Sequence, residues 1–149
     1  MERRKIIIIV SVVIGLIALG IIIPIITIEL TKEKYKWDDL DYGYDDNIID
    51  SGDYFALMID TSEYDHMSLS ISYAMNYTVD IYMLDSSNFI LFNNSLSFSY
   101  LNIADDVTGG SHGFGGYDGG SEYYLVINNE NPTDVLFDLE VHILLRLDL

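Results

Sequence analysis

Hydrophobic and polar side chains alternate over the C-terminal part of the chain. In residues 135–147, an apolar residue occupies every second position from Val135 to Leu147. In a helix these side chains would spread around the axis, whereas in a strand they all lie on one face. Leu136 and Leu144 interrupt the polar positions near the two ends. The pattern therefore predicts a long, half-buried final strand.

Shorter stretches with the same period precede this strand, and turn-forming residues separate them. In residues 67–75, for example, apolar side chains alternate with serines, which is typical of a half-buried strand. We expect further strands over residues 53–60, 67–75, 78–84, 88–92, 95–101 and 122–128. Six or seven short strands without an amphipathic helix indicate a mainly-β fold. We expect an antiparallel β-sandwich over residues 51–149.

The N-terminal part has a different pattern, because residues 6–28 form an apolar run without a charge. As a helix this run is about 34 Å long, enough for a bilayer core of about 30 Å. Arg3, Arg4 and Lys5 come directly before it, and flanking positive charge marks the inner side. We therefore expect one transmembrane helix at residues 6–28, with residues 1–5 in the cytoplasm and the domain outside the cell.

A cleaved signal peptide is the alternative for this segment. Residues 18–20 (ALG) offer small residues at a suitable spacing for cleavage. However, the apolar run continues to Ile28, which makes it longer than the core of most signal peptides. A retained anchor fits the segment better, and both interpretations place the domain outside the cell.

Residues 29–50 are polar, rich in aspartate and without an apolar period. Because like charges repel, we expect an extended acidic neck between the membrane and the domain. The same stretch has the oxygen-rich composition of a calcium loop, since hard divalent cations bind clustered carboxylates. The candidate calcium ligands are Asp39, Asp41, Asp45 and Asn47. No cofactor other than calcium is expected.

The charge balance narrows the choice of partners. The net charge is −17, and after Trp37 a single basic residue, Arg146, stands against 21 acidic residues. A domain without a basic surface cannot neutralise phosphates, so nucleic acid is excluded as a partner. The chain has no cysteine, which excludes disulfides and cysteine-ligated zinc or iron–sulfur sites.

Residues 109–120 (GGSHGFGGYDGG) are too rich in glycine for a regular element, and we expect a long exposed loop there. Loops often carry binding residues, and the candidates here are His112, Phe114, Tyr117 and Asp118. The loop lacks the lysine and the following helix of a phosphate-binding loop. The three histidines have no metal-site spacing, and we expect no enzymatic activity.

Two triplets fit the acceptor pattern for N-glycosylation, one starting at Asn76 and the other at Asn93. Both lie near turns or strand starts in the predicted order of elements. Asn76 and Asn93 are therefore candidate glycosylation sites, and a glycan there would mark an outward-facing surface.

Three short motifs follow one another in an order that is known from small β domains. Residues 52–55 (GDYF) open a strand, residues 79–85 (VDIYMLD) follow, and residues 123–127 (YYLVI) precede the final alternating strand. In this order, residues 50–147 resemble the pre-peptidase C-terminal domain family, and they are also similar to GOLD-like β-sandwiches. The resemblance implies a jelly-roll-like accessory domain of secreted or surface proteins, without an activity of its own.

Together the anchor, the neck and the sandwich indicate a module held at the cell membrane, with its C-terminal domain extracellular. We expect a binding, adhesion or structural role, with a protein or a carbohydrate as the ligand. A calcium-dependent surface module that uses Asp-rich loops is one alternative. An enzyme of unrecognised type is another.

Overall fold

Six strands and one short helix make up residues 35–149, the part of the chain that the computed structural model describes. The predicted cytoplasmic residues 1–5, the predicted transmembrane helix at residues 6–28 and the first residues of the predicted neck lie outside the described residues. Within residues 35–149, none of the helical structure is long and apolar enough to cross a membrane.

The strands form one antiparallel sheet, and every pairing in it is antiparallel. The predicted mainly-β, antiparallel class is therefore confirmed. In chain order the elements are β1 (Tyr35–Ile49), β2 (Tyr54–Asp60), β3 (His66–Asp85), α2 (Ser86–Asn93), β4 (Asn102–Asp118), β5 (Glu122–Asn128) and β6 (Val135–Asp148).

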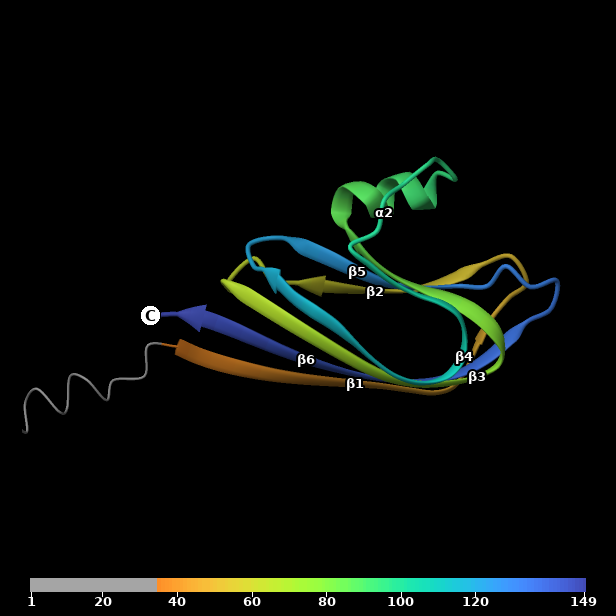
Figure 1. The fold of residues 1–149 in the computed structure, drawn as a ribbon, viewed down its shortest axis with the longest axis horizontal. Helices are drawn as coiled ribbons and strands as arrows, with labels where there is room; N and C mark the ends of the chain where they lie inside the picture. Colours follow the sequence, from red (N-terminus) through yellow and green to blue (C-terminus); the bar gives the residue numbers. More distant parts are fainter. Residues whose placement is uncertain (1–34) are drawn as a thin grey trace, which may run out of the picture. The chain divides into compact units, whose positions relative to one another are not determined.

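Strand β3 connects two layers of this sheet. Its first half, up to Met75, pairs with β6, and its second half, from Asp80, pairs with β5. Strand β4 follows β3 along the opposite side. The first layer therefore has the order β1, β6, β3 and β4, and the second has the order β2, β5, β3 and β4. Figure 1 shows β3 and β4 curving from one layer to the other, so that one continuous sheet forms a sandwich-like fold.

The hydrophobic core lies between the two layers. The alternating residues of β6 from Val135 to Leu145 are each at most 2% exposed, as their period predicts. Met67, Leu69 and Ile71 of β3 extend the same core. Burial of one such side chain stabilises the fold by about 1.5–3 kcal/mol. A domain without disulfides can therefore rely on this core.

Helix α2 covers the outer side of the second layer (Figure 1). The ring of Phe89 stacks on Tyr124 with their centroids 4.0 Å apart, and Phe92 meets Tyr54 edge-on at 5.0 Å. The buried members of this second cluster are Tyr82, Leu84 and Val126. Because the second layer is covered on both faces, the sequence of β5 is apolar at consecutive positions.

Residues 88–92 were predicted to form a strand, and this prediction is wrong because they belong to α2. A side-chain oxygen of Asp85 caps the helix, accepting a hydrogen bond from the backbone N–H of Asn88 at 2.8 Å. A short apolar run has the same pattern in a helix and in a strand, so the cap is the deciding feature. Residues 95–101, the next predicted strand, lead from α2 to β4 without forming a strand.

The acidic residues 35–49, predicted to be part of a solvated neck, form strand β1 instead. They pair with β6, from Tyr35 opposite Asp148 to Ile49 opposite Val135. Only Ile49 of β1 is buried. The prediction was wrong because backbone hydrogen bonds hold this edge strand, and they require no apolar period in the sequence. The β domain therefore includes residues 35–50 as well as residues 51–149.

The glycine-rich residues 109–118, predicted to be an exposed loop, belong to strand β4. Gly109 lies opposite Ala74 of β3, and Phe114 lies opposite Leu69. Glycine weakens a strand through its conformational entropy and its missing side chain, but it does not prevent pairing. Here the neighbouring strand β3 decides the structure, which the local sequence does not reveal.

Asn129 joins the turns at one end of the sandwich. It is fully buried, and its side-chain nitrogen donates to the carbonyls of Ile49, Asp50 and Thr133 at 3.0–3.1 Å. Its backbone N–H donates to the carbonyl of Asp53 at 3.0 Å. Buried carbonyls without a donor are costly, so Asn129 stabilises the end of β1 beside the connection from β5 to β6.

Replacing Ile49 by alanine tests whether the acidic segment belongs to the folded domain. Ile49 is 3% exposed and packs against the core. We expect Ile49→Ala to lower the free energy of unfolding by about 2–4 kcal/mol. Its neighbour Ile48 is 61% exposed, and Ile48→Ala should change this free energy by less than about 0.5 kcal/mol. Chemical denaturation measures both, and equally small effects would show that residues 35–49 are a spacer.

Candidate functional site

The outer surface of the first layer is polar. Neighbouring residues of a strand face opposite sides, so the residues between the core positions of β1, β6, β3 and β4 all point to this surface. We call it the outer polar face. Its central residues are Asp39, Asp41, Ser70, Ser72, Ser111, Glu140 and His142.

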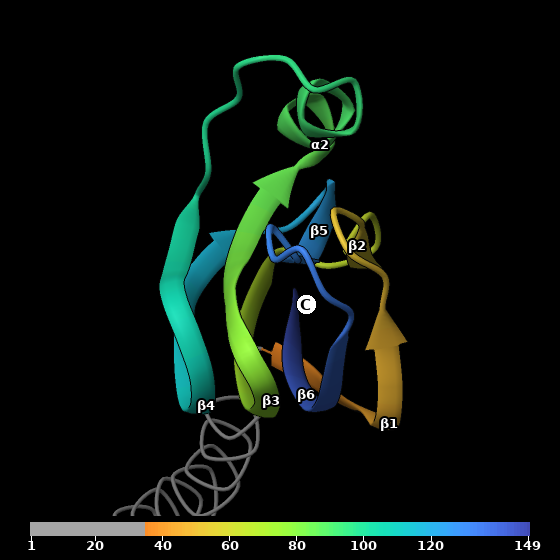
Figure 2. The ribbon, with the colours of Figure 1, turned by 90° about the vertical axis from the view of Figure 1, so that its right-hand side faces the viewer.

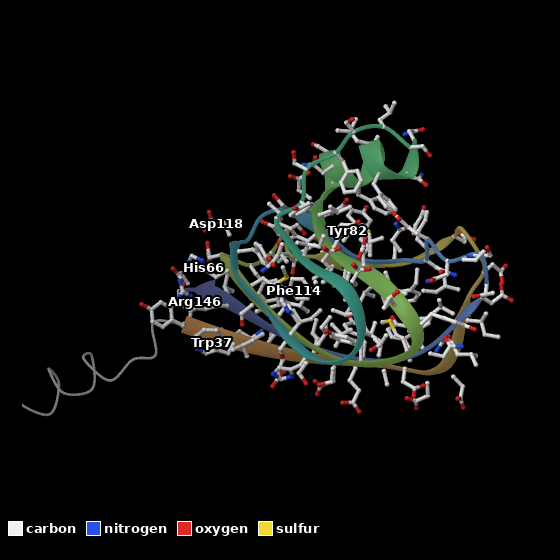
Figure 3. The ribbon with its side chains drawn as sticks, turned by 45° about the vertical axis from the view of Figure 1, so that its right-hand side comes forward. Trp37, His66, Tyr82, Phe114, Asp118 and Arg146 are labelled. Carbon is white, nitrogen blue, oxygen red and sulfur yellow. The ribbon has the colours of Figure 1, made fainter. Side chains whose placement is uncertain are left out.

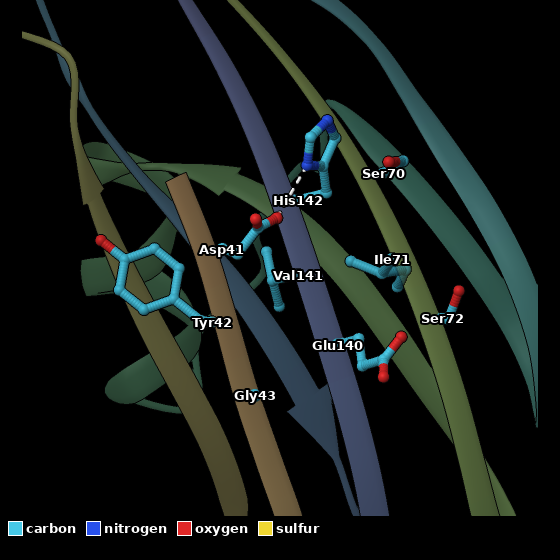
Figure 4. A pocket seen from close by; sticks show the side chains of 9 residues that line it. All are labelled: Asp41, Tyr42, Gly43, Ser70, Ile71, Ser72, Glu140, Val141 and His142. Atoms are coloured by element: carbon cyan, nitrogen blue, oxygen red, sulfur yellow. Dashed lines mark hydrogen bonds and ion pairs between the residues drawn. The ribbon is translucent and has the colours of Figure 1, made fainter. Parts of the chain in front are cut away.

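His142 lies between two carboxylates on this face. Its Nδ1 is 2.8 Å from an oxygen of Asp41 and 3.3 Å from an oxygen of Asp39. The register explains the contact, because Asp41 of β1 lies directly opposite His142 of β6 (Figure 4). One ligand atom from each of the three residues lies within 4.8 Å of the others. A histidine and two aspartates are residue types that can together bind one divalent cation.

An open depression of about 360 Å³ lies over this part of the face. Ser70, Ser72 and Glu140 line it together with Asp41 and His142 (Figure 4). The His142 side chain is 51% exposed and that of Asp41 is 79% exposed. Groups bound there would stay in contact with water.

The carboxylates raise the pKa of His142 above its ordinary value of 6.5, first through the hydrogen bond with Asp41 and then through the charge of Asp39. Because the folded pKa lies above the unfolded one, the attraction stabilises the fold below the unfolded pKa. This contribution is lost as the pH rises through the folded pKa. The protonated ring also neutralises part of the acidic face.

The register also places Ser70, His142 and Asp41 side by side on three neighbouring strands. These are the residue types of a serine hydrolase. In the structure, however, His142 bonds to Asp41 and makes no hydrogen bond with Ser70. Acyl transfer also needs donors aimed at the oxyanion in a site that excludes water, which an open sheet face does not provide. The arrangement therefore does not support this reaction.

Of the four predicted calcium ligands, the structure brings only Asp39 and Asp41 together. Asp45 and Asn47 lie further along β1, beside and beyond a bulge. At about 3.3 Å per residue, Asn47 is more than about 10 Å from Asp41. Asn47 instead donates to the carbonyl of Asp45. The predicted set is thus wrong as a single site, and His142 joins it only through the pairing of β1 with β6.

The four residues of the predicted binding loop lie on β4 and do not form one site. Phe114 is 2% exposed in the core (Figure 3), and Tyr117 is partly buried against the same core. The ring of His112 lies 4.7 Å from that of Phe114. Asp118 is exposed at the end of the strand, 3.7 Å from Nδ1 of His66. The loop prediction is wrong because the strand assigns these side chains to different surroundings.

A second acidic group, not singled out from the sequence, lies where β3 passes between the layers. Asp80 accepts hydrogen bonds from the backbone N–H of Asp106 at 2.9 Å and from the hydroxyl of Tyr82 at 3.0 Å. It also raises the pKa of Asp105, through a hydrogen bond and through like-charge repulsion. Asp106 has a φ of 52°. These contacts hold the bulge of β4 in place, which gives the group a structural role.

The predicted glycosylation sites Asn76 and Asn93 are both exposed. The side-chain oxygen of Asn76 accepts from the backbone N–H of Leu136, and that of Asn93 accepts from the Tyr54 hydroxyl. A glycan is attached to the side-chain nitrogen, which neither contact uses. Glycosylation at the two sites stays a prediction.

The interior of the described domain is almost free of polar side chains. Among residues 35–149, Thr61 and Asn129 are the only buried polar residues, and both bond to backbone carbonyls. The carboxylates and imidazoles in this range are all exposed or half-buried. Catalysis depends on preorganised groups in sites that exclude water. Among residues 35–149, no carboxylate or imidazole lies in such a water-excluded site.

Comparisons with known proteins identify no family for this chain. No protein-family model matches it, and no curated protein matches its sequence. Its fold is similar to part of dimeric latent PorU from Porphyromonas gingivalis, with a TM-score of 0.51 and 9% sequence identity. The match covers 78% of this chain and 13% of PorU. At this identity the likeness is one of fold alone.

Two further structures have lower scores. A chain of the Bacillus endospore appendages, which are disulfide-linked pili, has a TM-score of 0.46 at 9% identity, covering 79% of this chain and 91% of that one. The pre-peptidase C-terminal domain of collagenase from Bacillus anthracis has a TM-score of 0.40 at 11% identity, covering 70% and 87%. At TM-scores below 0.5 these two likenesses support no conclusion about the chain, and its resemblance to the pre-peptidase C-terminal domain family stays a prediction.

The titration of His142 tests the geometry of the site. We expect NMR titration to give His142 a pKa above 6.5, because Asp41 and Asp39 stabilise the protonated ring. The substitution Asp41→Asn should lower this pKa. The control Asp45→Asn, further along β1, should leave it unchanged. A pKa at or below 6.5, or one that does not respond to Asp41→Asn, would contradict the contact.

Proposed function

We propose that this chain is a non-catalytic binding or structural module at the cell surface, held in the membrane by residues 6–28. The observation that carries the proposal is the distribution of polar groups in residues 35–149. The interior is apolar, whereas the imidazoles, most of the carboxylates and four serines meet solvent on an ordered sheet. A sheet presents these groups in fixed register, so little additional ordering is needed when a ligand binds.

The sequence supports the proposed location and limits the ligand. Residues 6–28 have the length and apolarity of a transmembrane helix, and Arg3, Arg4 and Lys5 precede them. The many carboxylates of the domain disfavour nucleic acid and anionic lipid surfaces. A protein or a carbohydrate is the ligand class that this surface suits.

Labelling of intact cells tests the location, and the absence of native cysteine makes it simple. Ser97 is exposed, so we expect Ser97→Cys to react with a membrane-impermeant maleimide before the cells are permeabilised. The control Glu2→Cys, on the other side of the apolar run, should react only after permeabilisation. The opposite order, or labelling of Ser97→Cys only in broken cells, would overturn the proposed location.

A cation-dependent module is the second candidate, and the group of Asp39, Asp41 and His142 is the observation that favours it. Imidazole together with carboxylate suits zinc and related transition metals better than calcium, which prefers oxygen ligands alone. In such a module the cation would replace the proton on His142 and bridge β1 to β6.

Thermal unfolding with and without cations decides on this candidate. At a zinc concentration about 100-fold above Kd, binding should add about 2.7 kcal/mol to the free energy of unfolding. Chelator should remove the increase, and Asp41→Asn should abolish it, whereas Asp45→Asn should retain it. Equal unfolding midpoints with zinc, calcium and chelator would exclude a cation-dependent module.

A further inference from the structure

The sheet ends in three edge strands. Among residues 35–149, β1 pairs only with β6, β2 pairs only with β5, and β4 pairs only with β3. The free side of an edge strand presents unpaired N–H and C=O groups, which can pair with another chain. Proteins protect such edges with charges, bulges, short strands or covering segments. The three edges of this domain differ in that protection.

Two of the edges are protected. Strand β1 carries Asp38, Asp39, Asp41, Asp45 and Asp46, and its register is broken by a bulge between Tyr44 and Asn47. Strand β2 is seven residues long. Asp53 comes directly before it and Asp60 is its last residue, so its uncharged stretch is limited to residues 54–59. The corresponding stretch of β4, residues 107–117, is longer.

The edge of β4 lacks this protection over residues 109–114. This stretch pairs with β3 in unbroken register, from Gly109 opposite Ala74 to Phe114 opposite Leu69. The residues between Asp106 and Asp118 include no Asp, Glu, Lys or Arg, and His112 is the one imidazole among them. Gly109, Gly110, Ser111 and Gly113 are exposed. Figure 2 shows β4 along one side of the domain, with β3 as its neighbour among residues 35–149.

We propose that residues 109–114 of β4 take up an extended segment of a partner protein as an additional strand. The proposal rests on the proposed binding role and names the kind of ligand. Six residues are a typical strand length, about 20 Å. In such strand addition, backbone hydrogen bonds supply affinity, and the alternating side chains supply specificity.

The aspartates near the two ends of the β4 stretch indicate which residues flank the paired segment of the partner. Asp105 and Asp106 lie before the uncharged stretch, and Asp118 ends the strand after it. At that end the carbonyl of Asp65 accepts a hydrogen bond from Gly119, which places a further aspartate nearby. Basic residues on both sides of the added strand would face these carboxylates. A second copy of this domain fits less well as the occupant, because it would bring the same excess of negative charge.

The two faces of β4 indicate how the side chains of the partner alternate. Phe114 and the adjacent His112 lie on the core side. Ser111 lies on the other side, with its hydroxyl 3.0 Å from that of Ser72. An added strand would therefore carry apolar residues toward the rim of the core and small polar residues over the outer polar face.

The test uses the full-length chain in detergent micelles and the peptide Lys-Lys-Val-Thr-Val-Thr-Val-Thr-Lys-Lys. We expect saturable binding and slower hydrogen exchange of the β4 amides at residues 109–114, with the amides of β1 and β2 unchanged. Two N-methylated peptides, blocked at alternate amides, distinguish strand pairing from charge attraction. Only one edge of an added strand faces β4, so only the N–H groups on that edge bond to it. The peptide that is methylated on that edge should bind more than about 10-fold more weakly than the parent peptide. The peptide that is methylated on the other edge should bind nearly as well as the parent.

A matched pair of glycine substitutions locates the site on the protein. A Cβ at Gly113 or at Gly43 would meet nothing within 4 Å, so both positions accept a side chain, and both variants change the charge equally. Gly113→Lys places bulk and positive charge beside the β4 edge, and we expect about 10-fold weaker binding. Gly43→Lys on β1 should stay within about twofold of the wild type.

The proposal would be overturned if no saturable binding occurred below about 1 mM peptide, or if the two methylated peptides bound equally well. It would also be overturned if the peptide slowed hydrogen exchange in β1 or β2 instead of β4. A fourth contrary result would be a self-associated chain whose β4 amides are protected from exchange without peptide. The assay does not depend on the side of the membrane. If the peptide did not bind, the proposed location outside the cell would still stand. If Ser97→Cys were labelled only in permeabilised cells, the proposed strand addition would still stand.

Discussion

The division of β3 between two partner strands is the constraint on which the arrangement of the domain depends. Residues up to Met75 pair with β6, and residues from Asp80 pair with β5. β5 and β6 pair with the same edge of β3, which is possible because β3 passes from one layer to the other. Strand β4 follows this path, and Asp80 accepts a hydrogen bond from the backbone N–H of Asp106 where β4 bulges. The two layers therefore face each other over one core, although they belong to one sheet.

The same path determines which surfaces are exposed. In the first layer it leaves the aspartate-rich β1 at one rim and the uncharged part of β4 at the other. Between them, β6 and β3 present His142 and the serines of the outer polar face. One layer therefore offers a charged surface and a neutral backbone edge, each suited to a different kind of contact.

The sequence predicted those elements whose stability comes from burying one face. The period of β6 and of the first half of β3 is visible because Leu139, Ile143 and Leu69 pack in the core. The structure of β1 could not be predicted in this way, since its aspartates face water and its backbone bonds to β6. Strand β4 could not be predicted for a similar reason, because its glycines add no side chains to a period and its backbone pairs with β3. In the candidate site, Asp39 and Asp41 were predicted, while His142 comes from a position 101 residues beyond Asp41.

Composition and local periods were sufficient to predict the mainly-β class, most of the half-buried strands, the acidic surface and the apolar segment at residues 6–28. The folded domain was needed to show which strands are neighbours, that residues 35–49 and 109–118 are strands, and that His142 meets two carboxylates. The physical reason is that pairing uses backbone groups that nearly every residue shares. The sequence of a strand therefore carries little information about the distant strand beside it.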